Sequence, residues 1–127
     1  MIVIDASAAL AALLNAGLAR DALGSDRVCA PDLIDAEVAE GLRRGAAAGR
    51  VHPDVAWAAL DTWRQLGVRR FPTGPLLKRA WELREVLDTP TAASVALAER
   101  LGCDLLTARP ALAATKGPNC PIKAVPN

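Results

Sequence analysis

The chain has 127 residues with a hydrophobic fraction of 52% and a charged fraction of 23%, a composition that is ordinary for globular proteins and excludes a disordered one. A chain of this length can bury a core without disulfides or metals, and we expect residues 1–127 to form a single domain. The formal net charge of +1 excludes a global field that would draw the chain to nucleic acid.

In chain order, the hydrophobic pattern predicts buried strands where apolar runs do not alternate, and helices where alanine and leucine recur at helical spacing. We expect a strand at 2–4, helices at 7–14 and 19–23, a strand at 27–30, helices at 33–45 and 53–66, a strand at 68–71, helices at 75–86 and 89–101, a strand at 104–107, a helical turn at 110–114 and a strand at 122–125. Asp32 and Thr89 are the expected N-caps of the third and sixth helices. Strands that alternate with helices predict an α/β fold with a mostly parallel central sheet.

The cysteines and the hydropathy pattern indicate the cellular compartment in which the protein acts. Cys29, Cys103 and Cys120 form no CxxC pair and the only histidine is His52, so a structural zinc site is disfavoured and we expect reduced thiols. No apolar run reaches the ~18 residues of a membrane span, and no basic segment precedes the first apolar run. We therefore expect a cytoplasmic protein that does not enter a membrane.

Asp5 follows the β-branched run Ile2–Ile4 and precedes a helix, which places its carboxylate at the carboxyl end of a strand. In parallel sheets, functional sites form at those ends, and Thr107 ends another expected strand. The structural alternative is a simple helix N-cap, for which Asp is a preferred residue.

Glu37 lies on the apolar stripe of its helix, because it comes four residues after Leu33 and three after Ile34. A carboxylate that faces a core needs a partner, a metal ion or a shifted pKa. The alternative is a border residue that reaches solvent or pairs with an arginine. Two carboxylates in one cleft suit Mg²⁺, which prefers oxygen ligands and can activate water at a phosphodiester.

Four segments follow one another along the chain: residues 2–8, residues 31–44, residues 95–107 and the tail CPIKAV. In this order they resemble the PIN-domain toxins of the VapC family. Residues 2–8 (IVIDASA) are similar to the family's first strand and Asp, and residues 31–44 (PDLIDAEVAEGLRR) to its helix with the second acid. Residues 95–107 (VALAERLGCDLLT) and the tail CPIKAV resemble its later helix and strands. The resemblance implies a three-layer PIN-like domain, usually dimeric, and an endoribonuclease that uses Mg²⁺ or Mn²⁺ on structured RNA such as tRNA, rRNA or mRNA. It also implies a VapB-type antitoxin as partner.

By the same resemblance, Asp5 and Glu37 are the metal ligands and catalytic acids, and the small hydroxyl of Ser7 supports the first acid by a hydrogen bond. We also expect Thr107, as a hydroxyl at a strand end, to hydrogen-bond these acids. The sequence departs from the family at the third and fourth acids, where Thr91 and Arg109 stand. The aligned set then carries a net charge of about −1 in place of about −4, so we expect Arg109 to pair with Asp5 or Glu37 and to compete with Mg²⁺. Asp88 is a candidate replacement acid, although turn and cap chemistry also explains it.

Three function classes are considered, of which two lead. The first is a ribonuclease toxin with weakened activity, and the second is a PIN-fold module that binds antitoxin or RNA without cleaving. A phosphatase or receiver domain with Asp5 as nucleophile ranks last, because Ser7 stands where such phosphatases have a second Asp and no Lys follows the late strand. The chain has three tryptophans, Trp57, Trp63 and Trp81. We expect them to pack in the core or at a dimer interface, and the alternative is that they stack on RNA bases.

Overall fold

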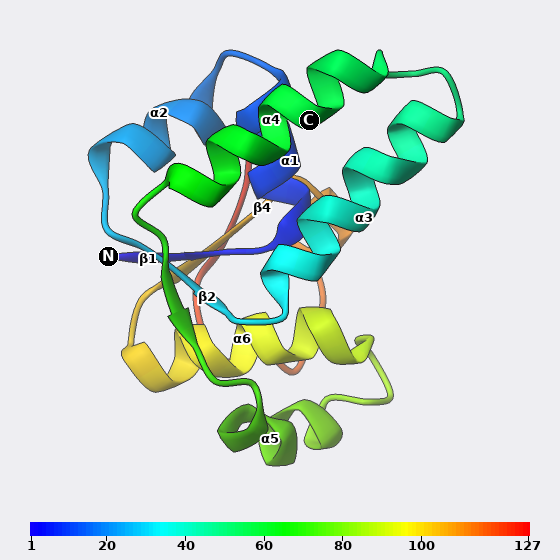
Figure 1. The fold of residues 1–127 in the computed structure, drawn as a ribbon. Helices are drawn as coiled ribbons and strands as arrows, with labels where there is room; N and C mark the ends of the chain where they lie inside the picture. Colours follow the sequence, from blue (N-terminus) through cyan, green and yellow to red (C-terminus); the bar gives the residue numbers. More distant parts are fainter.

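The computed structural model describes residues 1–127 and contains one five-stranded sheet (Figure 1). Its strands lie in the order β3-β2-β1-β4-β5, and every neighbouring pair is parallel. Their bounds are Ile2–Ile4 (β1), Val28–Pro31 (β2), Arg69–Phe71 (β3), Asp104–Thr107 (β4) and Ile122–Ala124 (β5). The predicted parallel α/β architecture is therefore confirmed.

Helices cover both faces of the sheet and make three layers. In Figure 1, α1 to α4 lie above the strands, while α5 and α6 lie below them. The bounds are Ala6–Leu14 (α1), Leu18–Ser25 (α2), Ile34–Ala47 (α3), Pro53–Gln65 (α4), Leu77–Glu82 (α5), Thr89–Leu101 (α6) and Pro110–Ala113 (α7), with a 3₁₀ turn (η1) at Gly74–Leu76. None of these helices combines the length and the apolar composition that crossing a bilayer requires.

Successive side chains of β1 point to opposite faces of the sheet, and the hydrophobic core accordingly has two halves. Ile4 packs with Val38 and Trp63 in the half beneath α1, α3 and α4, whereas Val3 packs with Leu97 and Leu105 in the half against α5 and α6. Both faces of β1 are covered, which explains why its sequence is apolar without interruption. The core positions β1 and β4 rigidly at the centre of the sheet.

Some local predictions were wrong. Leu33, not Asp32, occupies the N-cap position of α3, because the Asp32 carboxylate accepts a hydrogen bond from Thr73 instead. Asp88, not Thr89, caps α6, since its side chain accepts a hydrogen bond from the Thr91 amide. The helix expected over 75–86 is shorter, because a 3₁₀ turn precedes it and consecutive turns replace it after Glu82.

The direction in which successive strands are added to the sheet reverses at its centre. From β1 the chain moves outward to β2 and β3, then returns to β4 on the other side of β1 and continues to β5. The carboxyl ends of β1 and β4 therefore form a topological switch point, where open α/β sheets place their sites. Asp5 follows β1 and Thr107 ends β4 at this point.

Candidate active site

A cavity of about 220 Å³ lies at this switch point. Four helices meet around it, because Asp5 is the N-cap of α1, Glu37 and Thr91 lie in the first turns of α3 and α6, and Arg109 is the N-cap of α7. The lining residues come from all four: Asp5, Ala6, Ser7, Leu10, Glu37, Asp88, Pro90, Thr91, Ser94 and Arg109. Residues that are distant in sequence are thus gathered into a polar hollow.

Asp5 is held in one orientation. Its side chain is 6% exposed, and Oδ1 accepts hydrogen bonds from the Ser7 hydroxyl at 2.6 Å and from the Ala8 amide at 2.9 Å. Oδ2 accepts from the Thr107 hydroxyl at 2.6 Å. The N-cap interpretation and the site interpretation therefore hold together, since one oxygen caps α1 while the carboxylate borders the cavity.

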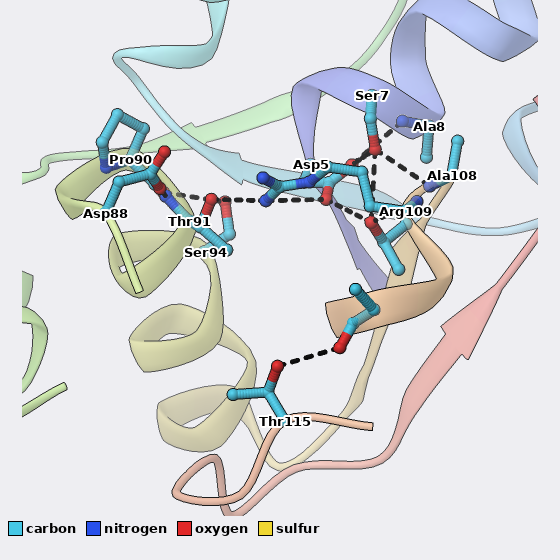
Figure 2. A network of polar contacts seen from close by, with 12 residues as sticks. Asp5, Ser7, Ala8, Asp88, Pro90, Thr91, Ser94, Ala108, Arg109 and Thr115 are labelled. Atoms are coloured by element: carbon cyan, nitrogen blue, oxygen red, sulfur yellow. Dashed lines mark hydrogen bonds and ion pairs between the residues drawn. The ribbon is translucent and has the colours of Figure 1, made fainter. Parts of the chain in front are cut away.

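A second set of hydrogen bonds fixes the residues that hold Asp5 (Figure 2). The Ala108 amide donates to the Ser7 hydroxyl at 2.9 Å, and the Arg109 amide donates to the Thr107 hydroxyl at 3.1 Å. The start of α1 and the end of β4 are thereby tied together through side chains. Ser7 and Thr107 thus contact Asp5 directly, in the arrangement that the sequence predicted.

Glu37 borders the same cavity from the first turn of α3. Burial, together with the negative charges of Asp5 and Asp88, raises the pKa of Glu37 to about 7, although Arg109 acts in the opposite direction. A carboxyl group with such a pKa titrates near neutral pH, and perturbed pKa values of this kind are common among residues of functional sites. The cavity therefore brings together the two acids that sequence spacing singled out.

Arg109 and Thr91, the two positions at which the resemblance led us to expect acids, contact each other. Nη2 of Arg109 donates a hydrogen bond to Oγ1 of Thr91 and lies 4.0 Å from Oδ2 of Asp5. The expected pairing is thus with Asp5, at the limit of an ion pair, while the direct hydrogen bond goes to Thr91. At an effective dielectric of ~20 this attraction is about 4 kcal/mol, and solvent around the 49%-exposed arginine side chain reduces it to about 1 kcal/mol.

Asp88 combines the two roles considered for it. It caps α6 by accepting from the Thr91 amide at 3.1 Å, and its side chain also borders the cavity. Asp88 is exposed to solvent, whereas Asp5 is buried. Asp88 adds negative charge to the lining of the cavity, and it is linked to Asp5 only indirectly, through Thr91 and Arg109.

The donor set fits a divalent ion only in part. No group of three or more His, Cys, Asp or Glu side chains is arranged to hold a metal. Asp5 and Glu37 nevertheless supply carboxylate oxygens to one cavity, and Mg²⁺ is commonly held by one or two carboxylates with water and substrate phosphate completing its coordination. The cavity thus suits an ion shared with a phosphate ligand and does not form a complete cage.

The sequence interpretation missed some residues of the cavity. Ser94 borders it one helical turn after Thr91, and its hydroxyl bonds the carbonyl of Pro90 at 3.4 Å. Leu10 borders it one turn after Ala6 and Ser7. Helical spacing from the predicted site residues was the signal that could have identified both.

The tryptophans divide between the core and the surface. Trp63 is 1% exposed and donates from Nε1 to Asp35 at 2.8 Å, which confirms core packing for this residue. Trp57 and Trp81 are 57% and 68% exposed, so the core interpretation was wrong for them.

All three cysteines are free thiols.

Comparisons with known proteins identify the family and the fold of the chain. Residues 2–116 match the family model described as PIN domain. The chain is 49% identical to Ribonuclease VapC9 of Mycobacterium tuberculosis over 99% of both chains. Its fold is similar to VapBC2 of Rickettsia felis bound to a promoter DNA fragment (TM-score 0.71, 12% identity, 98% of both chains). It is also similar to PAE2754 of Pyrobaculum aerophilum (TM-score 0.68, 26% identity, 91% of this chain and 85% of that one). The chain therefore belongs to the VapC family of PIN-domain proteins.

Proposed function

We propose that this chain is the ribonuclease toxin of a VapBC-type toxin–antitoxin pair, that it cleaves structured RNA with Mg²⁺ or Mn²⁺, and that its activity is weakened. One observation carries the proposal: Asp5 and Glu37 border one cavity at the switch point of a parallel sheet. The identity of 49% with proteins described as VapC ribonucleases supports the reaction class.

Each polar residue of the cavity has a task in this proposal. Asp5 and Glu37 would hold the ion, and its chemical contribution there would be Lewis acidity toward water and phosphate. Ser7 and Thr107 orient Asp5 through their 2.6 Å hydrogen bonds. Arg109, whose side chain is half-exposed at the cavity, contacts the RNA phosphate through its outer N–H groups.

The weakened activity follows from the third and fourth positions. Thr91 offers a neutral oxygen that already accepts a hydrogen bond from Arg109. The guanidinium brings a positive charge to within 4.0 Å of the Asp5 carboxylate. Both features reduce the attraction of the cavity for a divalent cation.

The partner is a VapB-type antitoxin, as in the Rickettsia felis VapBC2 structure. We expect the gene immediately upstream to encode a small ribbon-helix-helix or AbrB-like protein that binds this chain. We also propose that residues 1–127 act as one domain in the cytoplasm and form a homodimer. Exposed apolar residues on α5, Leu77 and Trp81, are candidates for the dimer contact.

A second candidate function is a non-cleaving module that binds antitoxin or RNA. The observation that favours it is the Arg109–Thr91 hydrogen bond, which replaces two carboxylates with an internally paired cation. Such a site retains a pocket for phosphate and loses metal affinity.

A cleavage assay separates the two candidates. Purified chain is incubated with tRNA, rRNA and mRNA in Mg²⁺, in Mn²⁺ and in EDTA, beside Glu37→Gln and the control Glu85→Gln, whose side chain is 82% exposed. The toxin proposal predicts slow cleavage that EDTA and Glu37→Gln abolish and Glu85→Gln preserves. Absence of cleavage under every condition, with retained binding to the neighbouring antitoxin, would establish the non-cleaving module instead.

A further inference from the structure

The charges that border the cavity are unequal. Asp5, Glu37 and Asp88 contribute three carboxyl groups, and Arg109 is the only basic residue among the lining residues. Carboxylates gathered in a space of about 220 Å³ repel one another unless a cation lies among them. A positive charge at this place lowers that repulsion, and the chain carries one in its own sequence as Arg109.

Arg109 is fixed from its backbone and from its guanidinium. The backbone N–H donates to the Thr107 hydroxyl at 3.1 Å, and the same hydroxyl donates to Asp5 Oδ2 at 2.6 Å. The guanidinium donates to the hydroxyl of Thr91, which is buried. Figure 2 shows the arginine side chain extended between Thr91 and Asp5. The cation is thus held toward the acids and does not merely point into solvent.

Thr91 has a specific part in this arrangement. A hydroxyl accepts the guanidinium hydrogen bond without adding charge, and the Thr91 amide is itself fixed by Asp88 at 3.1 Å. We propose that Arg109, oriented by Thr91 and Thr107, is the resident cation of the acidic cavity, so that the charge of the acids is partly neutralised and the site stays folded without a divalent metal. This inference rests on the weakened metal site of the proposed function and deepens it, and because it concerns the chain without RNA it holds whether or not the chain cleaves.

The chemistry of the guanidinium gives the inference its consequences. Arginine keeps its charge at all accessible pH values and cannot dissociate from the cavity as a metal ion does. A divalent ion must displace it from the neighbourhood of Asp5 or share that carboxylate with it. We therefore expect millimolar Mg²⁺ affinity and little change in thermal stability on adding Mg²⁺.

The experiment measures Mg²⁺ binding by calorimetry and the melting temperature in EDTA and in Mg²⁺, all without RNA. The variants are Arg109→Gln and, as matched control, Arg100→Gln in the last turn of α6, which is exposed and lies outside the cavity lining. The wild-type melting temperature is expected to change by less than about 1 °C with Mg²⁺. Arg109→Gln is expected to melt about 3–6 °C lower in EDTA, to recover with Mg²⁺ and to bind Mg²⁺ about tenfold more tightly. Arg100→Gln should match the wild type.

A second variant covers the case in which Arg109→Gln does not fold. Thr91→Val keeps the cation and removes the acceptor that orients it, and Mg²⁺ affinity is then expected to rise about threefold. Tight, stoichiometric Mg²⁺ binding by the wild type, or equal affinities in the wild type and the folded variants, would overturn the inference. Because no measurement uses RNA, failure here is distinct from failure of the proposed ribonuclease activity.

Discussion

The Thr107 hydroxyl donates a 2.6 Å hydrogen bond to Oδ2 of Asp5, joining residues that are 102 positions apart at the switch point of the sheet. Both residues are buried, which shields the bond from bulk solvent. The same hydroxyl accepts from the Arg109 amide. Thr107 therefore connects the first acid to the segment that carries the cation.

We predict that Thr107→Val lowers the free energy of unfolding by about 1–3 kcal/mol, because it leaves a carboxylate oxygen and an amide without their partner. Urea unfolding monitored by circular dichroism measures the loss. The control is Thr62→Val, at an exposed position on α4, which should change stability by less than about 0.5 kcal/mol. Equal stabilities for the two variants would show that the Thr107 bond is dispensable.

Trp63 and Trp57 offer a matched pair on one helix. Trp63 is 1% exposed and donates a hydrogen bond to Asp35, which also accepts one from Arg70 at 2.8 Å. Trp57 is 57% exposed. Trp63→Phe is expected to cost about 1–3 kcal/mol through the lost hydrogen bond and a small void, and Trp57→Phe less than about 0.5 kcal/mol. Chemical unfolding of both variants tests this, and a larger loss for Trp57→Phe would contradict it.

Glu37 gives stability a specific pH dependence in metal-free buffer. Its pKa is raised from 4.5 to about 7, mainly by burial and then by the charges of Asp5 and Asp88. The protonated form is favoured in the folded state, so this contribution is fully present below pH 4.5 and is lost as the pH rises through 7. Glu37→Gln should therefore be more stable than wild type at pH 8, by on the order of 2 kcal/mol, and not at pH 4.5. A pH-independent difference between the two proteins would refute this assignment.

The exposed Trp81 tests the proposed homodimer. Its side chain is 68% exposed on α5, near Leu77, which is 49% exposed. If this surface forms the dimer contact, Trp81→Glu should convert the dimer to a folded monomer, because a charge cannot be buried unpaired in an apolar interface. Light scattering after gel filtration reads the mass. A dimer that survives Trp81→Glu would place the contact elsewhere.

Much of the architecture could be predicted from the sequence, because strand runs, helix periodicity and strand-end residues are local signals. Asp5, Glu37 and Thr107 were identified in this way. The caps at Asp32 and Thr89 were mistaken, because a tertiary hydrogen bond from Thr73 and the alternative cap Asp88 decide them. Local patterns do not contain such contacts.

The geometry of Arg109 was only partly predictable. Its opposite charge predicted pairing with an acid, but charge alone could not choose between Asp5 and Glu37. Nor could it show that Thr91 would take the hydrogen bond. The two substituted positions form a contact between α6 and the start of α7, which exists only once both helices are packed.

The cleavage rate of the double variant Thr91→Asp and Arg109→Asp, measured beside the wild type on one structured RNA with Mg²⁺, tests the weakened metal site most directly. The variant replaces a hydroxyl and a guanidinium at the cavity with two carboxylates, which should raise both Mg²⁺ affinity and cleavage, by about tenfold or more, if the fold is retained. Circular dichroism confirms folding. We predict slow or absent cleavage by the wild type and a clear gain in the variant. Robust wild-type cleavage that Glu37→Ala abolishes, with no gain in the double variant, would contradict a site weakened by Thr91 and Arg109.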